Sequence, residues 1–281
     1  MASKTNLSVV IDVGTTKITA LAGIKNSEGK MEILGVARVS AKGIKRGVVL
    51  NIEEAAASVD KVLSTLGEQV KRKIRKVDIA YSGQPMKIVE HKGFKLTSGD
   101  GVVMQSDVDE LFKEARSLNV EKDFVILHVV PQAYLIDDEI PELNPAGVTG
   151  RKIEARFKVV AVPEAHLQNF ERVLKKAGVE LGDVTLAPLA ASEAVLTDDE
   201  KEMGAILLDI GAGTTKLAVF KEGTMVHTAV IPFGGNVVTK DIKEGCSIIP
   251  KWAEQLKTQF GQALGDFADD QKVVTIPGHS G

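Results

Sequence analysis

One short motif occurs twice in the chain, and this repeat limits the possible folds more than any other feature. Residues 12–17 read DVGTTK, and a longer version, DIGAGTTK, returns at residues 209–216. An apolar run precedes and follows each copy, which predicts two β-hairpins. Each hairpin has a tight turn of Gly and Thr, and its first strand ends in an Asp. We therefore expect a chain built from two related units.

The chemistry of these turns suits the phosphate groups of a nucleotide. Glycines let the backbone approach closely and point successive N–H groups into one concavity, which holds phosphate oxygens. Threonine hydroxyls add donors, and an Asp beside the turn suits a hydrated Mg²⁺, which prefers one or two carboxylates plus water. A single Gly-Thr-Thr turn fits an ordinary hairpin. Its recurrence, with Asp and Lys at both borders, predicts two turns that clamp a phosphate tail from both sides.

Composition and charge exclude several other classes of protein. The net charge is −3 and the pI is about 6.0, so the chain has no electrostatic footprint for nucleic acid. The one cysteine, Cys246, excludes an internal disulfide and fits a reducing compartment. The N-terminus lacks an apolar signal core, and no apolar run reaches transmembrane length. We expect a cytoplasmic chain that does not span a membrane by itself.

Apolar periodicity predicts the same order of elements in both units, namely a hairpin, a third strand and a helix. In the first unit, Asn51 is the expected N-cap of the helix. After this unit, a strand, a helix capped by Ser106 and two long strands predict a small insert. The second unit stops after a strand-like stretch at 272–276, before the helix and strand that would match the first unit. We therefore expect a C-terminally truncated fragment.

Duplicated domains with paired phosphate hairpins resemble the superfamily of actin, heat-shock chaperones and sugar kinases. Within it, essentially the whole chain resembles the FtsA family of bacterial cell-division proteins. The resemblance is carried by residues 10–17, 128–137, 209–216 and 230–236. The position of the insert is its most specific sign, because the insert of actin lies elsewhere and has a different fold. The implied fold class is α/β, with duplicated actin-like (ribonuclease H-like) domains, an inserted β-α-β-β (α+β) subdomain and an incomplete second domain.

The resemblance also implies domain boundaries and site residues around ATP and Mg²⁺. Residues 7–83 and 163–198 would form domain I, 84–162 the insert, 199–247 the core of domain II, and 248–281 the start of its outer subdomain. Asp12 and Asp209 would hold Mg²⁺ through its water molecules. The residues implied to contact the nucleotide are Gly14, Thr15, Thr16, Lys17, Gly211, Gly213, Thr214, Thr215, Gly234, Gly235, Glu254 and Lys257. The last two, three residues apart on a helix, also fit an ordinary surface ion pair.

One departure from the superfamily concerns hydrolysis, which needs a group that orients the attacking water. The superfamily has Glu or Gln at the strand–helix junction where this chain has Ala187. A methyl group cannot orient water or accept a proton. We therefore expect nucleotide binding with at most very slow ATPase activity.

The family implies an ATP-binding protein that polymerises, links the ring of the tubulin-like protein FtsZ to the cytoplasmic face of the cell membrane, and recruits later division proteins through residues 84–162. The resemblance implies that most of the family's site for the FtsZ tail, and its membrane-binding C-terminal helix, lie outside these 281 residues. We therefore expect this chain to bind ATP weakly and not to bind liposomes. The alternatives are a pilus-assembly adaptor resembling PilM and a small-molecule kinase of the same superfamily.

Overall fold

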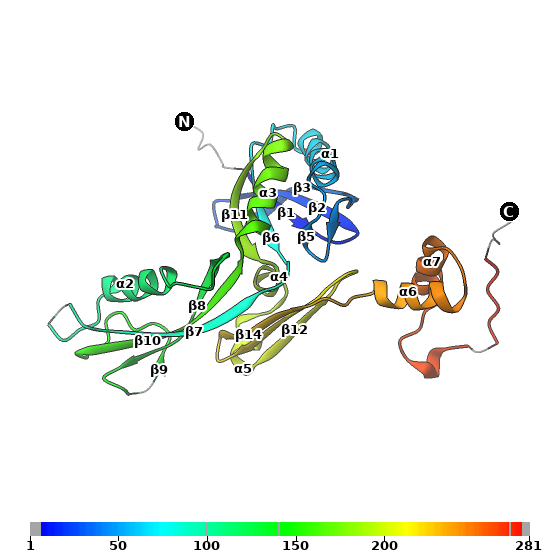
Figure 1. The fold of residues 1–281 in the computed structure, drawn as a ribbon. Helices are drawn as coiled ribbons and strands as arrows, with labels where there is room; N and C mark the ends of the chain where they lie inside the picture. The colour runs from blue at the N-terminus through cyan, green and yellow to red at the C-terminus, as the bar shows by residue number, and fades with distance from the viewer. Residues whose placement is uncertain (1–6, 99, 140, 270, 277–281) are drawn as a thin grey trace.

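The computed structural model describes residues 7–98, 100–139, 141–269 and 271–276. Three main sheets organise them: a five-stranded sheet, a four-stranded sheet and a three-stranded sheet. In Figure 1 the five-stranded sheet lies above the other two, and the last two helices lie to one side of all three.

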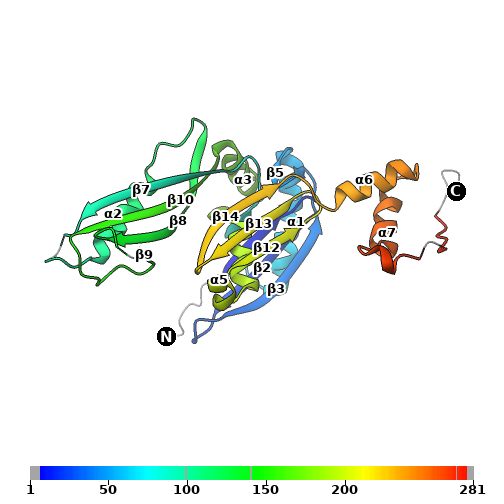
Figure 2. The same ribbon diagram turned by 90° about the horizontal axis from the view of Figure 1, so that it is seen from below.

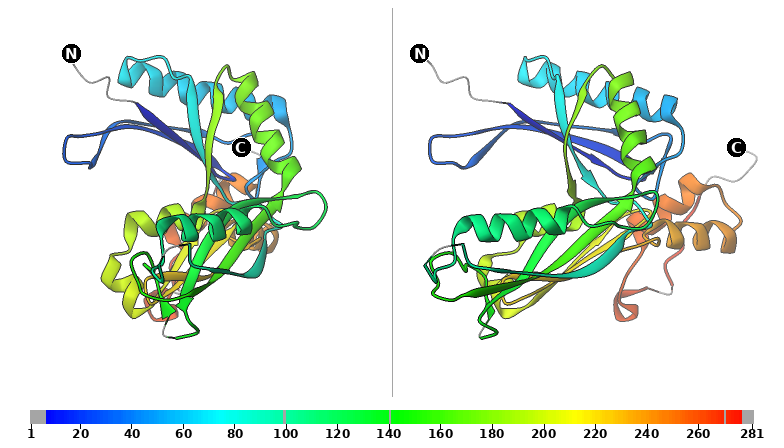
Figure 3. Two further views of the ribbon diagram at one scale, coloured as in Figure 1. Left: turned by 90° about the vertical axis from the view of Figure 1, so that its left-hand side faces the viewer. Right: turned by 60° about the vertical axis from the view of Figure 1, so that its left-hand side comes forward.

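The five-stranded sheet belongs to the first unit and has the strand order β11-β6-β1-β2-β3. Its strands are β1 (Ser8–Val13), β2 (Lys17–Lys25), β3 (Met31–Ser40), β6 (Lys76–Tyr81) and β11 (Glu180–Leu186). Two helices, α1 (Ile52–Val70) and α3 (Glu164–Lys176), pack together over one face of this sheet (Figure 3). The expected cap of α1 is confirmed, because Asn51 Oδ1 accepts a hydrogen bond from the Glu54 amide at 3.1 Å. A short hairpin, β4 (Ile44–Lys45) and β5 (Val48–Val49), precedes α1.

The insert forms the four-stranded sheet, with strand order β7-β10-β8-β9 and one covering helix. Its elements are β7 (Lys87–Leu96), α2 (Gln105–Arg116), β8 (Phe124–Ile136), β9 (Pro141–Glu142) and β10 (Lys152–Pro163). The predicted β-α-β-β order is confirmed, with the short β9 as an addition. The predicted cap of α2 is wrong. The helix begins one residue before Ser106 with Met104 as its N-cap, because the Asp107 carboxylate accepts a hydrogen bond from the Met104 amide at 2.9 Å.

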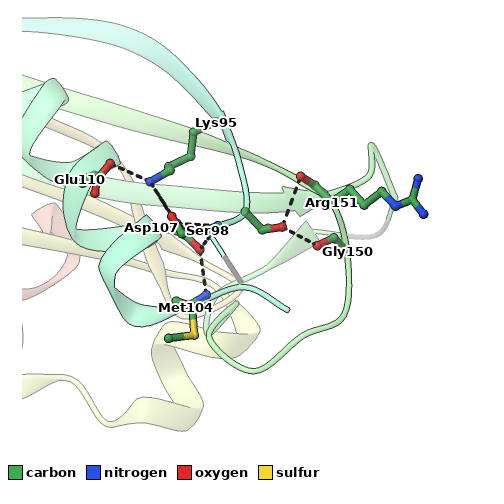
Figure 4. A network of polar contacts seen from close by, with 8 residues as sticks. Lys95, Ser98, Met104, Asp107, Glu110, Gly150 and Arg151 are labelled. Atoms are coloured by element: carbon green, nitrogen blue, oxygen red, sulfur yellow. Dashed lines mark hydrogen bonds and ion pairs between the residues drawn. The ribbon is translucent and has the colours of Figure 1, made fainter. Parts of the chain in front are cut away.

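Asp107 is a buried charge at the centre of a polar network in the insert (Figure 4). The Ser98 hydroxyl donates to its carboxylate at 2.6 Å, and Lys95 Nζ lies 3.0 Å from the same oxygen. Burial on its own would raise the pKa of Asp107. The hydrogen bonds from Ser98, Met104 and Lys95 outweigh burial and hold this pKa well below its usual range. The network therefore stabilises the charged form and connects β7 to α2.

The second unit contains the three-stranded sheet and the helices around it. Its elements are α4 (Ala187–Val195), α5 (Asp198–Met203), β12 (Ala205–Ile210), β13 (Thr215–Lys221), β14 (Thr224–Ile231), α6 (Asn236–Gly245), α7 (Pro250–Phe260) and a 3₁₀ turn at Gly265–Phe267. Helices α6 and α7 pack against each other beyond the ends of these strands (Figure 2). The strand expected at 272–276 is wrong, because this stretch pairs with no other described strand. Among the described helices, none is both long and apolar enough to cross a membrane.

Strand β8 runs from the insert to both units and is bonded to each. His128 Nε2 accepts a hydrogen bond from the Leu186 amide, at the end of β11, at 2.9 Å. Gln132 Nε2 donates to the Met225 carbonyl oxygen on β14 at 3.1 Å. Burial, helped by the positive charge of Arg116, lowers the pKa of His128. The ring is therefore neutral near pH 7, as its acceptor role requires.

Candidate functional site

The two repeated motifs form the same tight turn. The Gly14 amide donates to the Lys17 carbonyl oxygen at 3.0 Å, and the Gly211 amide donates to the Thr214 carbonyl oxygen at 2.9 Å. A Cβ at Gly14 would lie only 2.8 Å from the Lys17 oxygen, so the turn would have to shift, and a Cβ at Gly211 would make a tight contact of 3.0 Å with the Thr214 oxygen. Both turns thus have two-residue connections, and each follows a strand that carries the Asp.

The strand registers show that the two lysines of the repeat are not equivalent. Asp209 pairs across its hairpin with Lys216, whereas Asp12 pairs across its own hairpin with Thr19. Lys17 instead closes its turn at the position that Thr214 occupies in the second. The prediction that the two lysines are matching borders of the two turns is therefore wrong. The second motif is two residues longer than the first, but its turn has the same length, because Thr215 and Lys216 already belong to the return strand β13.

The tips of the two turns touch. A Cβ on Gly213 would lie 2.5 Å from Thr15 Oγ1, so the absence of a side chain permits this contact. The same Thr15 Oγ1 accepts a hydrogen bond from the Arg46 amide at 3.2 Å. Within the described part of the chain, the amides of the connecting residues have no acceptor: Thr15, Thr16, Ala212 and Gly213. Such amides remain available to an anionic ligand.

A cavity of about 470 Å³ lies between the two turns. Most residues that the sequence singled out line it: Asp12, Gly14, Thr15, Thr16, Lys17, Asp209, Gly211, Thr214, Gly235, Glu254 and Lys257. They come from both hairpins, from the loop before α6 and from α7. The volume is within the usual range for small-molecule sites, about 300–1,000 Å³. The fold therefore brings residues from distant parts of the sequence to one site.

Three other singled-out residues, Gly213, Thr215 and Gly234, are not part of the cavity lining. The Thr215 hydroxyl donates to the Phe233 carbonyl oxygen at 2.9 Å. A Cβ on Gly234 would lie 2.4 Å from the Gly211 carbonyl oxygen. These contacts hold the loop before α6 against the second turn, so Thr215 and Gly234 support the cavity from outside its lining.

Glu254 and Lys257 on α7 are joined to this loop. Lys257 Nζ donates to the Gly235 carbonyl oxygen at 3.1 Å, and it lies 2.7 Å from Glu254 Oε2. The Thr239 hydroxyl on α6 also donates to Glu254. The hydrogen bonds from Lys257 and Thr239 lower the pKa of Glu254. The pair is therefore more than an isolated surface ion pair, because it connects α6, α7 and the Gly235 loop at the cavity.

Several residues that line the cavity were not among the predicted ligand-binding residues: Gly47, Ser82, Ile210, Ala212, Thr258 and Lys216, which was predicted only as a border of the second motif. Strand β6 runs parallel to β1, so Ser82, just after β6, lies at the same sheet edge as Asp12. The carboxyl ends of parallel strands are a usual place for ligand sites, and this rule could have found Ser82. Gly47 lies directly against it, since a Cβ there would be 2.6 Å from the Ser82 carbonyl oxygen.

The two carboxylates of the cavity lie close enough to affect one another. Burial raises the pKa of Asp12, and the negative charge of Asp209 raises it further. The positive charges of Lys216 and Lys17 act in the opposite direction without reversing the shift. Lys216 Nζ is 2.6 Å from Asp209 Oδ2. Around the two turns the site thus combines these two aspartates with Lys17 and Lys216, and Glu254 and Lys257 line it on α7.

Ala187, at the junction that would carry the water-orienting group, is the first residue of α4. It is buried and is absent from the cavity lining described above. Glu193, further along α4, is exposed and pairs with Lys201 at 2.9 Å.

Two family models match the chain. The model for "Cell division protein FtsA" matches residues 206–281, and the model for "SHS2 domain inserted in FTSA" matches residues 83–161. The second match falls on the four-stranded insert.

Comparison with solved structures shows the actin-like fold. A structure of the PilM-PilN type IV pilus biogenesis complex has a TM-score of 0.66 at 17% identity, covering 90% of this chain and 70% of that one. MreB5 of Spiroplasma citri bound to ADP has a TM-score of 0.50 at 18% identity, covering 93% of this chain and 64% of that one.

Curated relatives identify the family. Cell division protein FtsA of Pseudomonas aeruginosa is 32% identical over 96% of this chain and 64% of its own length. FtsA of Escherichia coli K12 is 32% identical over 100% of this chain and 66% of its own length. The chain thus spans slightly less than two thirds of these relatives. Identity of this extent, together with the two family models and the actin-like fold, shows that the chain belongs to the FtsA family of cell division proteins.

Proposed function

We propose that the cavity between the two turns binds ATP and that the bound nucleotide holds the two units together. One observation carries this proposal: the turns of two separate hairpins line the same cavity and present amides without acceptors in the described chain. Successive free amides of this kind suit phosphate oxygens. Lys17 and the hydroxyls of Thr15 and Thr16 add positive charge and donors at the same wall.

We propose that Asp12 and Asp209 hold a Mg²⁺ ion through its water molecules. Both carboxylates line the cavity, and oxygen ligands of this kind suit the ion. The described residues contain no cluster of three or more metal-binding side chains, which favours a hydrated ion over a fully caged one. When bound, Mg²⁺ would neutralise part of the phosphate charge. The residues present therefore fit this cation.

We also propose that hydrolysis is very slow. Ala187 offers only a methyl group at the junction where a water-orienting side chain would lie, and Glu193 is paired at the surface. Orientation of the attacking water is a large part of catalysis by nucleotide hydrolases. Bound nucleotide in this chain would then set the arrangement of the two units more than it would supply a chemical step.

In the dividing cell we propose that the full-length protein polymerises, links the FtsZ ring to the cytoplasmic face of the membrane, and recruits later division proteins. Membership of the FtsA family supports this role. The insert, residues 84–162, would carry contacts to neighbouring subunits and later division proteins. Its outer strand β7 exposes Phe94 and Leu96, which supports a contact surface there.

Isothermal titration with ATP and Mg²⁺ tests the nucleotide site. We expect saturable binding by the unmodified chain and its loss in Asp12→Ala and Asp209→Ala. Glu193→Ala is a matched control, because it removes a carboxylate that lies outside the cavity. Binding that persists in both aspartate variants would contradict the proposed site.

A further inference from the structure

Lys216 is a cation enclosed within the candidate site. It lies on β13 directly opposite Asp209, and its Nζ is 2.6 Å from Oδ2 of that residue. The Lys216 side chain is only 11% exposed. A lysine ammonium that loses this much water needs a carboxylate partner to offset the lost hydration. Lys216 is therefore held as a positive charge in the cavity wall.

The same ammonium also acts on the carboxylate of the other hairpin. Among the charges around Asp12, Lys216 is the strongest attractive one and Asp209 the repulsive one. The position across the first hairpin from Asp12 is Thr19, which has no charge. Lys216 is therefore paired with Asp209 and also attracts the charge of Asp12, and the formal charge of these three side chains is −1 instead of −2.

We propose that Lys216 is a tethered cation that supplies, inside the site, part of the positive charge that a divalent metal ion would bring. Removal of Mg²⁺ would then weaken nucleotide binding less in this chain than in a site whose two carboxylates have no lysine partner. The inference rests on the proposed nucleotide site. Its physical basis is that a triphosphate approaching Asp12 and Asp209 is repelled by both, and a cation paired with Asp209 weakens this repulsion.

Lys17 cannot take this part, although it lines the same cavity. Its side chain is exposed, and among the described residues it has no ion-pair partner. An exposed charge acts through water, whereas a charge held in the wall acts through a medium of lower dielectric constant. The effect on metal dependence is therefore expected from Lys216 and not from Lys17.

The test compares ATP affinity in excess Mg²⁺ with ATP affinity in excess EDTA, for the unmodified chain and for Lys216→Met. Methionine keeps the apolar stem and removes the charge. We expect EDTA to weaken binding by only a few-fold in the unmodified chain. In Lys216→Met we expect a loss on the order of tenfold larger, because the charge of Asp209 is then no longer compensated and adds to that of Asp12. The readout is a dissociation constant from titration calorimetry, so it does not depend on hydrolysis.

Two control variants separate charge from structure. Lys216→Arg keeps the charge, and its metal dependence is expected to stay close to that of the unmodified chain. Lys221→Met removes an exposed lysine from the same strand, one that pairs with the neighbouring Glu222, and it is expected to change nothing.

The outcomes also separate this inference from the proposed function. If EDTA abolishes ATP binding in the unmodified chain while Mg²⁺ supports it, the inference is overturned and the nucleotide site stands, whether or not Lys216→Met folds. Equal metal dependence in the unmodified chain and a folded Lys216→Met also overturns it. If the unmodified chain binds no ATP under either condition, the inference and the proposed function both fail.

Discussion

Strands β1 and β12 hold the same place in their hairpins, yet their apolar side chains have opposite environments. Residues at matching positions are buried in β1 and exposed in β12: Val9, Ile11 and Val13 are 3%, 0% and 3% exposed, whereas Ile206, Leu208 and Ile210 are 67%, 55% and 69% exposed. The turns that follow the two strands are nevertheless alike, with the same closing hydrogen bond. A few residues specify the turn, whereas burial depends on the elements around the strand.

The elements around the two strands explain this difference. In the first unit, β6 and β11 extend the sheet beyond β1, and α1 and α3 complete the core that contains its apolar residues. In the described part of the second unit, the sheet ends at β12, and α6 packs against α7. The same apolar pattern therefore contributes to stability in one unit and is exposed in the other.

The largest expected effect is a difference in stability between Ile11→Ala and Leu208→Ala. Ile11 is fully buried, so its truncation should cost about 2–5 kcal/mol of the free energy of unfolding. Leu208 is mostly exposed, so its truncation should change stability by no more than about 0.5 kcal/mol. Urea unfolding of the two variants measures this. Equal losses would mean that the exposed face of β12 is covered in solution.

The insert offers a third environment, in which a charge is buried but hydrogen-bonded. Asp107→Asn should cost about 1–3 kcal/mol, because it disrupts the contacts with Ser98 and Lys95. Asp109→Asn, at an exposed position on the same helix, is the matched control. Urea unfolding followed by a probe in the insert measures both variants.

Asp107 also makes the stability of the insert depend on pH. Its pKa is lowered in the folded chain, so its stabilising effect is fully present above the unfolded value of about 3.9. The effect is lost as the pH falls below that value toward the lowered pKa. The free energy of unfolding should therefore decrease more steeply with falling pH for the unmodified chain than for Asp107→Asn. Parallel pH profiles would show that Asp107 is not the titrating group.

Gly234→Ala tests whether the loop before α6 must lie against the second turn. The added Cβ would be 2.4 Å from the Gly211 carbonyl oxygen, and a backbone atom at this position cannot give way without moving the turn. We expect ATP affinity to fall on the order of tenfold, because the free energy of such a loss is of the size that overpacking usually costs. Gly245→Ala, where a Cβ meets nothing within 4 Å, should leave affinity unchanged. Titration calorimetry distinguishes the two.

The smallest expected effect concerns hydrolysis. Ala187→Glu should raise the rate of phosphate release only a few-fold. A well-placed general base contributes roughly 10²–10⁴-fold. The smaller effect is expected because Ala187 is buried and does not line the cavity. Ala190→Glu adds the same carboxylate at an exposed position of α4 and should have no effect. Brisk hydrolysis by the unmodified chain would show that another residue orients the water.

Features that depend on neighbouring residues in the sequence could be predicted. The two hairpins, the Asn51 cap and the cavity residues of the two turns followed from motif and periodicity, whereas Gly235, Glu254 and Lys257 came from the family resemblance. The position of Lys216 opposite Asp209 did not, because hairpin register depends on which residues the turn contains. The burial of Asp107 was also missed. An acidic residue in a first helical turn looks exposed until the loop that covers it is known.

Strand β8 has a consequence for any motion between the two units. This strand is hydrogen-bonded through His128 to the end of β11 and through Gln132 to β14. It therefore connects both units to the insert. A paired strand resists stretching, because its backbone is already nearly extended. If the two units open or close, either one of these hydrogen bonds breaks or the insert tilts with the strand. Because β8 spans the insert, a small change in the distance between the two units would then become a larger displacement at the far end of the insert.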